Sequence, residues 1–477
     1  MEEFKPHIGK NVIETLTLGM YEDPRFIYRE YVQNAADQID IAVEYGILDR
    51  KSDGEINIII DKDQKMITVE DNATGIKSSE VLQFLGDVAN SQKDKEIRKG
   101  FRGIGRLGGL GYCEKLVFET TYKGEAMKST ITLNAKQLKE IIENKADTRD
   151  AAAVISVITT LDKKEAAMDE HYFHVKLINV TKEELLDDIH VKNYLSIVAP
   201  IPFDPEFPFQ HEIRKYFNAR NVKIEEYDVH LNLNQKKLYK PYKTHILDKD
   251  NVSVSEILDI GFFDIMGMED EIIAIGWYGI SDLLNFQIPD NNLERGIRLR
   301  KDNIGIGSEF TLSRFFKESR QNLNYIGEVH AISSSFVPNA RRDYFNDNKT
   351  TQLFESSLRD FFPKLGLFTR ESSDLRNRKK DIEIYRNKKV EFNSYSDNEL
   401  TNRQEKDLRD TLAVLKKKAS EASRKITKIR EKSLQDKDLN IVYKSIIGDL
   451  DIMIDVEEES SVERKNYPME LSQLNEN

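Results

Sequence analysis

The sequence holds very little cysteine: Cys113 is the only one among 477 residues. One cysteine excludes an intramolecular disulfide and a zinc site built from several thiolates. No run of 18 apolar residues occurs, which argues against a membrane-spanning helix, and the first ten residues lack the apolar segment of a signal peptide. These absences predict a protein of the reducing cytoplasm that has no membrane partner.

Positive charge is also in deficit, because 71 Lys and Arg face 83 Asp and Glu, a net charge of −12. A chain of this sign is not expected to coat DNA by bulk attraction, although a local basic patch stays compatible with it. Charged residues make up 32 % of the chain. That share exceeds the usual quarter or so and indicates long solvated helices.

Proline marks the predicted domain border. Four of the eleven prolines lie in 193–209, and we place a boundary at about residue 205. The sequence then predicts four regions: an α/β domain over 1–205, a second α/β domain over 206–348, a charged helical and coiled-coil-prone region over 349–455, and an acidic disordered tail over 456–477.

A helix is predicted over about 24–45, with Asp23 as its N-cap, Pro24 at its first position and Gly46 at its end. Glu30, Asn34 and Asp37 lie at i, i+4 and i+7 on one face of this helix. A polar stripe most often faces solvent. This one is flanked by Tyr31 and Ala35 and suits a specific task, since an Asn carbonyl can bind Mg²⁺ and a Glu can polarise a water.

A second carboxylate stands at the end of a predicted strand. Strands are expected over 55–60 and 65–71, and Asp71 closes the latter before the residues NATGI. An Asp after a strand is usually a turn former. Here Gly75 allows a ligand to approach the backbone, and a buried carboxylate would accept a hydrogen bond from an adenine amino group.

Glycine is concentrated in one segment, because six of the 23 glycines fall in residues 100–111. Successive backbone N–H groups in such a loop can cradle phosphates, although a merely flexible loop explains the glycines equally well. It is not a Walker loop, because no Gly-Lys-Ser/Thr follows, and no strand directly precedes it as in a dinucleotide fingerprint.

The order of these three segments resembles the GHKL superfamily, which includes the heat shock protein 90 chaperones, type II topoisomerases, MutL-type repair proteins, sensor histidine kinases and microrchidia (MORC) ATPases. The matching segments are YREYVQNAADQID, VEDNATGI and KGFRGIGRLGGLG. The resemblance implies a Bergerat-type ATP-binding α/β sandwich, then a middle or transducer-like α/β domain, then the charged helical region.

The resemblance also implies roles for single residues, with ATP and Mg²⁺ as ligands. Glu30 would be the general base for the attacking water, Asn34 the Mg²⁺ ligand, and Asp71 the group that reads the adenine amino group. The other implied nucleotide-binding residues are Asp37, Gly75, Arg102, Gly103, Ile104 and Gly105.

Two features depart from the family pattern. The adenine motif usually reads Asp-x-Gly-x-Gly, and Ala73 takes the middle glycine position here. A Gly-Thr pair that holds a water near adenine is missing from 171–177, and neither Thr120 nor Thr121 aligns with it. The first departure puts nucleotide affinity in question more than function.

A cationic loop lies near the end of the second predicted domain. FVPNARRDYFNDN (336–348) looks like the Asn-x-x-Arg-Glu loop of the heat shock protein 90 middle domain. Arg342 then falls on the arginine that contacts the γ-phosphate in that family, with Arg341 as runner-up. An arginine delivered by domain closure suits phosphoryl transfer, because it stabilises charge in the closed state alone. A surface arginine pair on a turn is the plainer interpretation.

An a/d heptad pattern and a basic run share the helical region. The pattern steps by four and three residues through Leu408, Leu412, Leu415, Ala419, Ala422, Ile426 and Ile429. This seam either packs back on the second domain or joins two copies of the chain. The run KKKASEASRKITKIREK (416–432) is solvated surface by default and the best local site for nucleic acid otherwise.

The sequence therefore predicts a slow, Mg²⁺-dependent ATPase that acts as a conformational clamp. The first hypothesis is a chaperone-like protein resembling heat shock protein 90, an ATP-dependent homodimer with a protein client. The second is a nucleic-acid-associated ATPase of the MORC or MutL kind, for example in a prokaryotic defence system. The third is an ATP-sensing scaffold with negligible turnover that reports to a partner protein.

Overall fold

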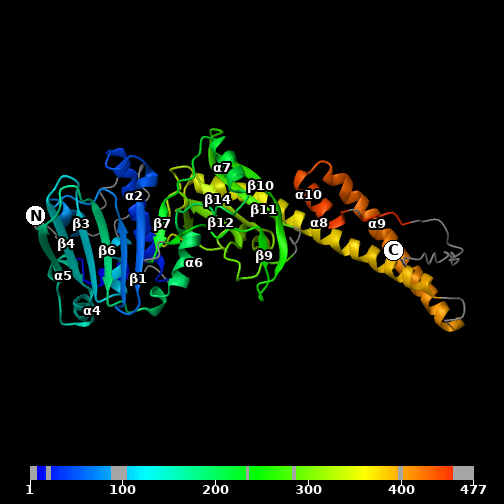
Figure 1. Ribbon diagram of the computed structural model, residues 1–477, viewed down its shortest axis with the longest axis horizontal. Helices are drawn as coiled ribbons and strands as arrows, with labels where there is room; N and C mark the ends of the chain where they lie inside the picture. Colours follow the sequence, from blue (N-terminus) through cyan, green and yellow to red (C-terminus); the bar gives the residue numbers. More distant parts are fainter. Residues whose placement is uncertain are drawn as a thin grey trace, which may run out of the picture.

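The computed structural model describes residues 8–17, 23–86, 105–232, 236–281, 286–395, 401–448 and 450–454. Two sheet-containing bodies and a helical arm follow one another along the long axis of the molecule (Figure 1). In the described part of the chain, none of the helices combines the length and the apolarity that crossing a bilayer requires.

The first body is built on an eight-stranded sheet with the order β5-β4-β3-β6-β2-β1-β7-β8. All neighbours are antiparallel except β1 and β7, which run parallel. The strands are β1 (Glu55–Asp61), β2 (Met66–Asp71), β3 (Lys115–Thr121), β4 (Met127–Asn134), β5 (Thr159–Glu165), β6 (Tyr172–Ile178), β7 (Asp228–Leu231) and β8 (Lys236–Lys237).

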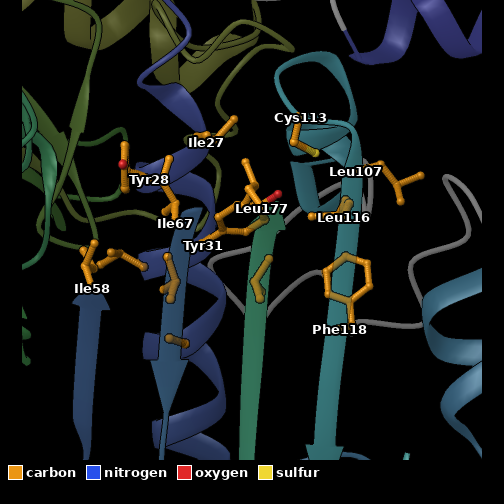
Figure 2. Close-up of a cluster of buried hydrophobic side chains, with 14 of the residues drawn as sticks. Ile27, Tyr28, Tyr31, Ile58, Ile67, Leu107, Cys113, Leu116, Phe118 and Leu177 are labelled. Atoms are coloured by element: carbon orange, nitrogen blue, oxygen red, sulfur yellow. The ribbon is translucent and has the colours of Figure 1, made fainter. Parts of the chain in front are cut away.

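Helix α2 (Phe26–Glu44) packs on one face of this sheet (Figure 2). Its Ile27, Tyr28 and Tyr31 side chains meet Ile67 and Leu177 from the sheet in one hydrophobic core. The remaining helical segments of this body are α1 (Asn11–Thr17), η1 (Lys51–Asp53), α3 (Val81–Gly86), η2 (Gly105–Gly111), α4 (Ala135–Glu143), α5 (Ala151–Ile158), η3 (Glu183–Leu185) and α6 (Asp188–Val198).

The chain crosses between the two bodies more than once. Helix α7 (Gln210–Asn218) buries Ile213 and Phe217 in a core that includes Trp277 of the second body. The chain then returns, and β7 and β8 extend the first sheet. The boundary at about residue 205 stays a prediction, and two strands that follow it in sequence belong to the first sheet.

The second body contains a six-stranded sheet with the order β13-β12-β14-β11-β10-β9. The long antiparallel hairpin of β10 and β11 forms one side, and β12 pairs in parallel with β14. The elements are β9 (His245–Leu247), β10 (Ser253–Met266), β11 (Ile272–Ser281), β12 (Gly296–Lys301), β13 (Ile304–Ile306), η4 (Ser313–Phe315), η5 (Ser319–Asn324) and β14 (Ile326–Ala331).

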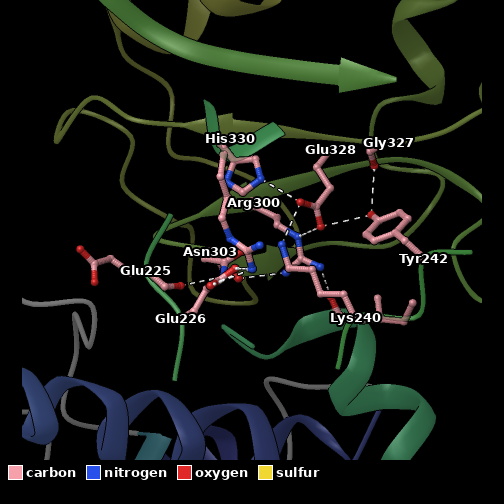
Figure 3. A network of polar contacts seen from close by, with 11 residues as sticks. Glu225, Glu226, Lys240, Tyr242, Arg300, Asn303, Gly327, Glu328 and His330 are labelled. Atoms are coloured by element: carbon pink, nitrogen blue, oxygen red, sulfur yellow. Dashed lines mark hydrogen bonds and ion pairs between the residues drawn. The ribbon is translucent and has the colours of Figure 1, made fainter. Parts of the chain in front are cut away.

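A buried polar network lies where the two bodies meet (Figure 3). The Glu328 carboxylate accepts hydrogen bonds from Lys240 Nζ at 2.9 Å, from Tyr242 Oη at 3.1 Å and from the Arg300 guanidinium. Arg300 Nη2 also donates to the carbonyl oxygen of Ile197 in α6, at 2.8 Å. The network therefore ties α6 of the first body to β12 and β14 of the second.

Three helices follow the second sheet in the described part of the chain: α8 (Lys349–Ser394), α9 (Asn402–Ser433) and α10 (Lys437–Ile447). The first part of α8 shares the core of the second sheet through Phe354, Leu358 and Phe362. Further along, α8 and α9 form an antiparallel hairpin that extends away from the second body (Figure 1).

The heptad seam of α9 packs against other helices of the same chain. Leu412, Ala419, Ala422, Ile426 and Ile429 are buried in the same core as α8 and α10, and Leu408 and Leu415 pack against that core. Of the two interpretations of the pattern, packing back within the chain is therefore the observed one. The predicted tail over 456–477 lies outside the described residues.

The mixed α/β class is confirmed, and the predicted strands over 55–60 and 65–71 appear as β1 and β2. The predicted start of α2 is wrong by two residues. Asp23 does not cap the helix, because its carboxylate accepts hydrogen bonds from the backbone N–H and the guanidinium of Arg25. Residues 23–25 form a turn instead, and the helix begins at Phe26.

Candidate active site

The polar stripe of α2 does not face solvent. Glu30 and Asp37 expose 6 % and 3 % of their surface, and Asn34 is half-buried. Burying a carboxylate is costly, and a protein core seldom accepts one without a partner. The solvated-face interpretation of Glu30, Asn34 and Asp37 is therefore wrong, and the stripe belongs to an enclosed polar site.

Arg342 reaches Glu30 from the second body. Its Nε lies 3.0 Å from Glu30 Oε1, and both side chains are largely withdrawn from water. Its Nη1 donates a hydrogen bond to Gln33 Oε1 in the same helix. Arg29 lies beside this pair, with its Nη2 3.7 Å from Glu30 Oε1. The structure thus brings together two residues that are 312 positions apart in the sequence and were proposed separately.

The loop around Arg342 is a tight, locally bonded turn. Asn339 N–H donates to Tyr344 O at 2.9 Å, and Arg342 N–H donates to Asn339 O at 3.1 Å. The carbonyl oxygen of Arg342 accepts from Gly307 N–H at 2.9 Å. Arg342 itself adopts a left-handed φ of 55°, which a non-glycine residue seldom does. The neighbouring Arg341 is exposed, so the runner-up is not the arginine at Glu30.

The glycine-rich segment packs directly against Glu30. A Cβ atom on Gly105 would come within 2.3 Å of Glu30 Oε2, so only glycine fits there without a shift of that carboxylate. Gly109 N–H donates to Tyr31 Oη at 3.2 Å, and Leu107 and Leu110 are buried. From Gly105 onward the segment is therefore a packed part of the site. The predicted residues Arg102, Gly103 and Ile104 lie outside the described residues.

Asp71 forms a second polar centre, at the end of β2. Its side chain is 6 % exposed, and Oδ1 accepts a hydrogen bond from Ala73 N–H at 3.1 Å. Burial raises the pKa of Asp71 to about 7, and the Ala73 N–H opposes that rise. A neutral carboxyl group is therefore favoured here over a wider pH range than at the protein surface.

The turn after Asp71 is seated on the ends of β3 and β6. Gly75 has a φ of 65°, and a Cβ atom there would come within 1.6 Å of the carbonyl oxygen of Thr121. Thr120 Oγ1 accepts from Ile76 N–H and donates to Tyr172 O, both at 2.9 Å. Gly75 is thus required by close backbone contact, and Thr120 is an anchor of the turn that the sequence did not reveal.

The second departure from the family pattern has a structural counterpart. On β6 the residue paired with Asp71 is Phe173, not a threonine, and the Phe173 ring stacks on Phe118. His171 Nδ1 lies 2.7 Å from the carbonyl oxygen of Ala73, within hydrogen-bond distance. The hydroxyl of Thr121 is buried and finds no hydrogen-bond partner among the described residues. The side-chain contacts to the 71–76 turn therefore come from Thr120 and His171, not from the threonine of a Gly-Thr pair.

Comparison with known proteins identifies the first body. Residues 30–166 match the family described as "Histidine kinase-, DNA gyrase B-, and HSP90-like ATPase". The chain carries a GHKL ATPase domain. The match begins at Glu30 and includes Asn34, Asp71 and the glycine-rich segment, so the separately reasoned motifs fall inside it.

Relatives of the GHKL ATPase domain include bacterial proteins named chaperone protein HtpG. The protein from Alkaliphilus metalliredigens is 30 % identical over 117 residues, which cover 22 % of this chain and 18 % of the relative. The protein from Nocardia farcinica is 26 % identical over 207 residues, which cover 39 % and 30 %. The chain thus spans less than a third of these relatives, and the homology is distant.

Proposed function

We propose that this protein hydrolyses ATP with Mg²⁺ and uses the reaction to change how its two sheet bodies contact each other, as a chaperone-like clamp. One observation carries the proposal: Arg342 of the second body contacts Glu30 of the GHKL ATPase domain at 3.0 Å. An arginine on a separate body couples chemistry to movement, because its contact with the first body can be made and broken.

The residues present fit an ATP site. Oε1 of Glu30 is buried against Arg342 Nε at 3.0 Å, so it would accept a proton from a water once that contact opens. Gly105 brings the backbone of the glycine-rich segment directly against the Glu30 carboxylate, where a Cβ atom would not fit. Asn34, half-buried one helical turn after Glu30, offers a neutral carbonyl oxygen. Mg²⁺ bound there would neutralise phosphate charge.

Glu30 and Arg342 would divide the chemistry between them. Glu30 orients the attacking water and accepts its proton as the water oxygen bonds to the γ-phosphorus and the bridging bond to ADP breaks. Arg342 compensates charge on the phosphoryl oxygens, and Gln33 holds its guanidinium toward α2. Asp71 accepts a hydrogen bond from the adenine amino group. Asp37, Gly75 and the segment that includes Arg102, Gly103, Ile104 and Gly105 complete the proposed nucleotide contacts.

The arginine contact also implies that nucleotide competes with the protein for Arg342. Arg342 occupies Glu30 Oε1, so a phosphate that draws the guanidinium away would free this carboxylate oxygen. Glu30 would then become available to water. The proposal also includes slow turnover by a cytoplasmic protein that acts on a protein client. The protein would form an ATP-dependent homodimer, and the contact between the two copies would lie away from the buried α9 seam.

Hydrolysis and molecular mass, measured together, test this proposal. Wild type and Glu30→Ala are assayed for ATP hydrolysis, and both are examined by light scattering and small-angle X-ray scattering with and without a non-hydrolysable ATP analogue. We expect slow hydrolysis that falls by about 10²–10⁴-fold in the variant, with analogue-driven compaction or dimerisation retained. Tight ATP binding without Glu30-dependent hydrolysis contradicts the clamp and leaves the nucleotide-sensing scaffold.

A further inference from the structure

The basic run of α9 places its cations on the face opposite to the buried seam. Residues 416–432 hold eight Lys and Arg against two Glu, which leaves the rest of the chain with a net charge of −18. At 100° per residue, six of the cations and Glu421 fall within a sector of about 120° on the solvent side. One of the six, Lys432, pairs with Glu371. We call the other five the basic stripe: Lys417, Lys418, Arg424, Lys425 and Lys428, all of them exposed.

The basic stripe has no acidic partner among the described residues. On α8, Arg378 pairs with Asp374 and Asp381, and Lys388 pairs with Glu391. In contrast, no carboxylate of the described residues lies within 4.0 Å of the charged groups of the stripe. The solvated-helix interpretation predicts mixed, mutually paired charges, as these α8 residues show. Glu421 lies on the same face as the stripe, so the five cations and this carboxylate together leave a net charge of +4 for an external anion.

The place of the basic stripe on the helical arm leaves it accessible to a long polyanion. The α8–α9 hairpin extends away from the second body, so the stripe is held apart from most of the acidic chain (Figure 1). The span from Lys417 to Lys428 is about 16 Å at the helical rise of 1.5 Å per residue. Double-stranded DNA carries one phosphate charge per about 1.7 Å of its axis, so several phosphates fit along this length.

The apolar face of α9 is not available for a lipid surface. A membrane-bound amphipathic helix inserts its apolar side chains between lipids. Here Ala419, Ala422, Ile426 and Ile429 are buried against the other helices of the same chain. The exposed side therefore offers charge with little apolar surface, which suits a hydrophilic polyanion.

We propose that the basic stripe of α9 binds the phosphate backbone of a nucleic acid duplex, without reading its sequence. The affinity arises from release of counterions from the phosphates and therefore falls steeply with salt. The proposal does not depend on ATP hydrolysis, because the stripe lies on a different element from Glu30 and Arg342.

The test uses the full chain and three substitutions that remove charge and keep the side chains polar: Lys417→Gln, Arg424→Gln and Lys428→Gln together. Binding of labelled DNA and RNA duplexes is measured by fluorescence anisotropy over a range of salt concentrations. The matched control is Lys62→Gln, Lys65→Gln and Lys164→Gln, which alters net charge equally at lysines that pair with Asp188, Glu183 and Asp162.

We expect the wild type and the control variant to bind a duplex with the same steep salt dependence. The stripe variant should bind at least tenfold more weakly at low salt, with the slope of log affinity against log salt reduced by about 3. Binding to DNA alone, RNA alone or both supports the proposal and identifies the source of the phosphates. Unchanged ATP hydrolysis in the stripe variant shows that the chain is intact.

Three results would overturn the proposal. One is that the wild type binds neither duplex at low salt. Another is that the control variant weakens binding as much as the stripe variant. Binding would then depend on the net charge of the chain and not on the position of the basic stripe. The third is stripe-dependent binding to vesicles of phosphatidylserine and phosphatidylcholine in place of the duplexes, which would make a lipid surface the partner.

Discussion

Glu30, Asp37 and Asp71 carry carboxyl groups that are almost entirely withdrawn from water, although each could have been a surface residue on sequence grounds. Such burial costs folding free energy unless another interaction compensates it. For Glu30 the compensation comes from Arg342, and for Asp71 it comes in part from a single backbone N–H. The cost is consistent with carboxyl groups that are kept for chemistry, because a charged side chain is seldom fully buried without such a reason.

The raised pKa of Asp71 predicts a pH dependence of stability. Because the folded-state pKa is about 7 and the unfolded value near 4, the folded chain holds the extra proton between them, and stability falls as pH rises through this window. Asp71→Asn should remove that fall. The change in unfolding free energy that it causes should be more favourable at pH 8 than at pH 4, by on the order of 2–4 kcal/mol. Urea unfolding at both pH values measures it. An equal effect of the substitution at both would contradict the assignment.

Gly105 should be irreplaceable for turnover. A Cβ atom would come within 2.3 Å of Glu30 Oε2, so Gly105→Ala must displace the proposed base by a few tenths of an ångström or more. We expect a loss of turnover of about 10-fold or greater, because catalytic groups tolerate little misplacement. Gly9→Ala is the control, since its Cβ would meet nothing within 4 Å. Equal turnover in the two variants would be inconsistent with a catalytic Glu30.

The residues of the site were predictable in part. Spacing on one helix identified Glu30, Asn34 and Asp37, because i, i+4 and i+7 positions share a face whatever the tertiary structure is. Gln33 and Thr120 were not predicted, since their roles arise from Arg342 and from the 71–76 turn, which come close only after folding. The helix pattern could have drawn attention to Gln33, a polar residue beside this stripe that proves to be almost wholly buried.

On the scale of elements, α9 shows how one periodicity admits two structures. The a/d pattern specifies an apolar seam and does not specify its partner, which is α8 and α10 of the same chain here. Ile426→Ala should therefore destabilise the monomer by about 2–4 kcal/mol, from lost burial and a residual cavity. The exposed Val414→Ala is its control and should cost well under 1 kcal/mol.

Thermal unfolding and mass measured on the same samples check this expectation. Both variants should keep the mass of the wild type, because the seam is internal. If Ile426→Ala instead dissociated a dimer while leaving the unfolding of the separated chains unchanged, the seam would be an interface between copies.

On the scale of the whole molecule, the buried network at the junction of the bodies determines how they are held. Glu328 is fully buried, and the nearby Arg300 and Lys240 hold its pKa well below its usual range, against the effect of burial. The sequence did not reveal this network, because its members come from β12, β14 and the 240–242 segment. Only the assembled sheets bring their charges together.

Removing the central carboxylate should weaken this junction. Glu328→Gln leaves Arg300 and Lys240 buried with less compensation, and we expect a loss of about 3–5 kcal/mol in unfolding free energy. Glu318→Gln, which breaks exposed ion pairs with Arg320 and Arg370, should cost less than about 1 kcal/mol. Denaturant unfolding compares the two. Equal losses would mean that the network does not stabilise the junction.

The most direct test of the account is the rate of ATP hydrolysis by Arg342→Ala and Arg341→Ala, which remove adjacent arginines of the same loop. Arg342 contacts Glu30, whereas Arg341 is exposed. If the second body supplies a catalytic arginine, Arg342→Ala should lose about 10²-fold or more in turnover while ATP binding stays close to wild type. Its thermal stability should fall, because the buried Glu30 carboxylate loses its partner. Arg341→Ala should hydrolyse ATP at the wild-type rate. Wild-type hydrolysis by Arg342→Ala would contradict the central claim that the two bodies share one active site.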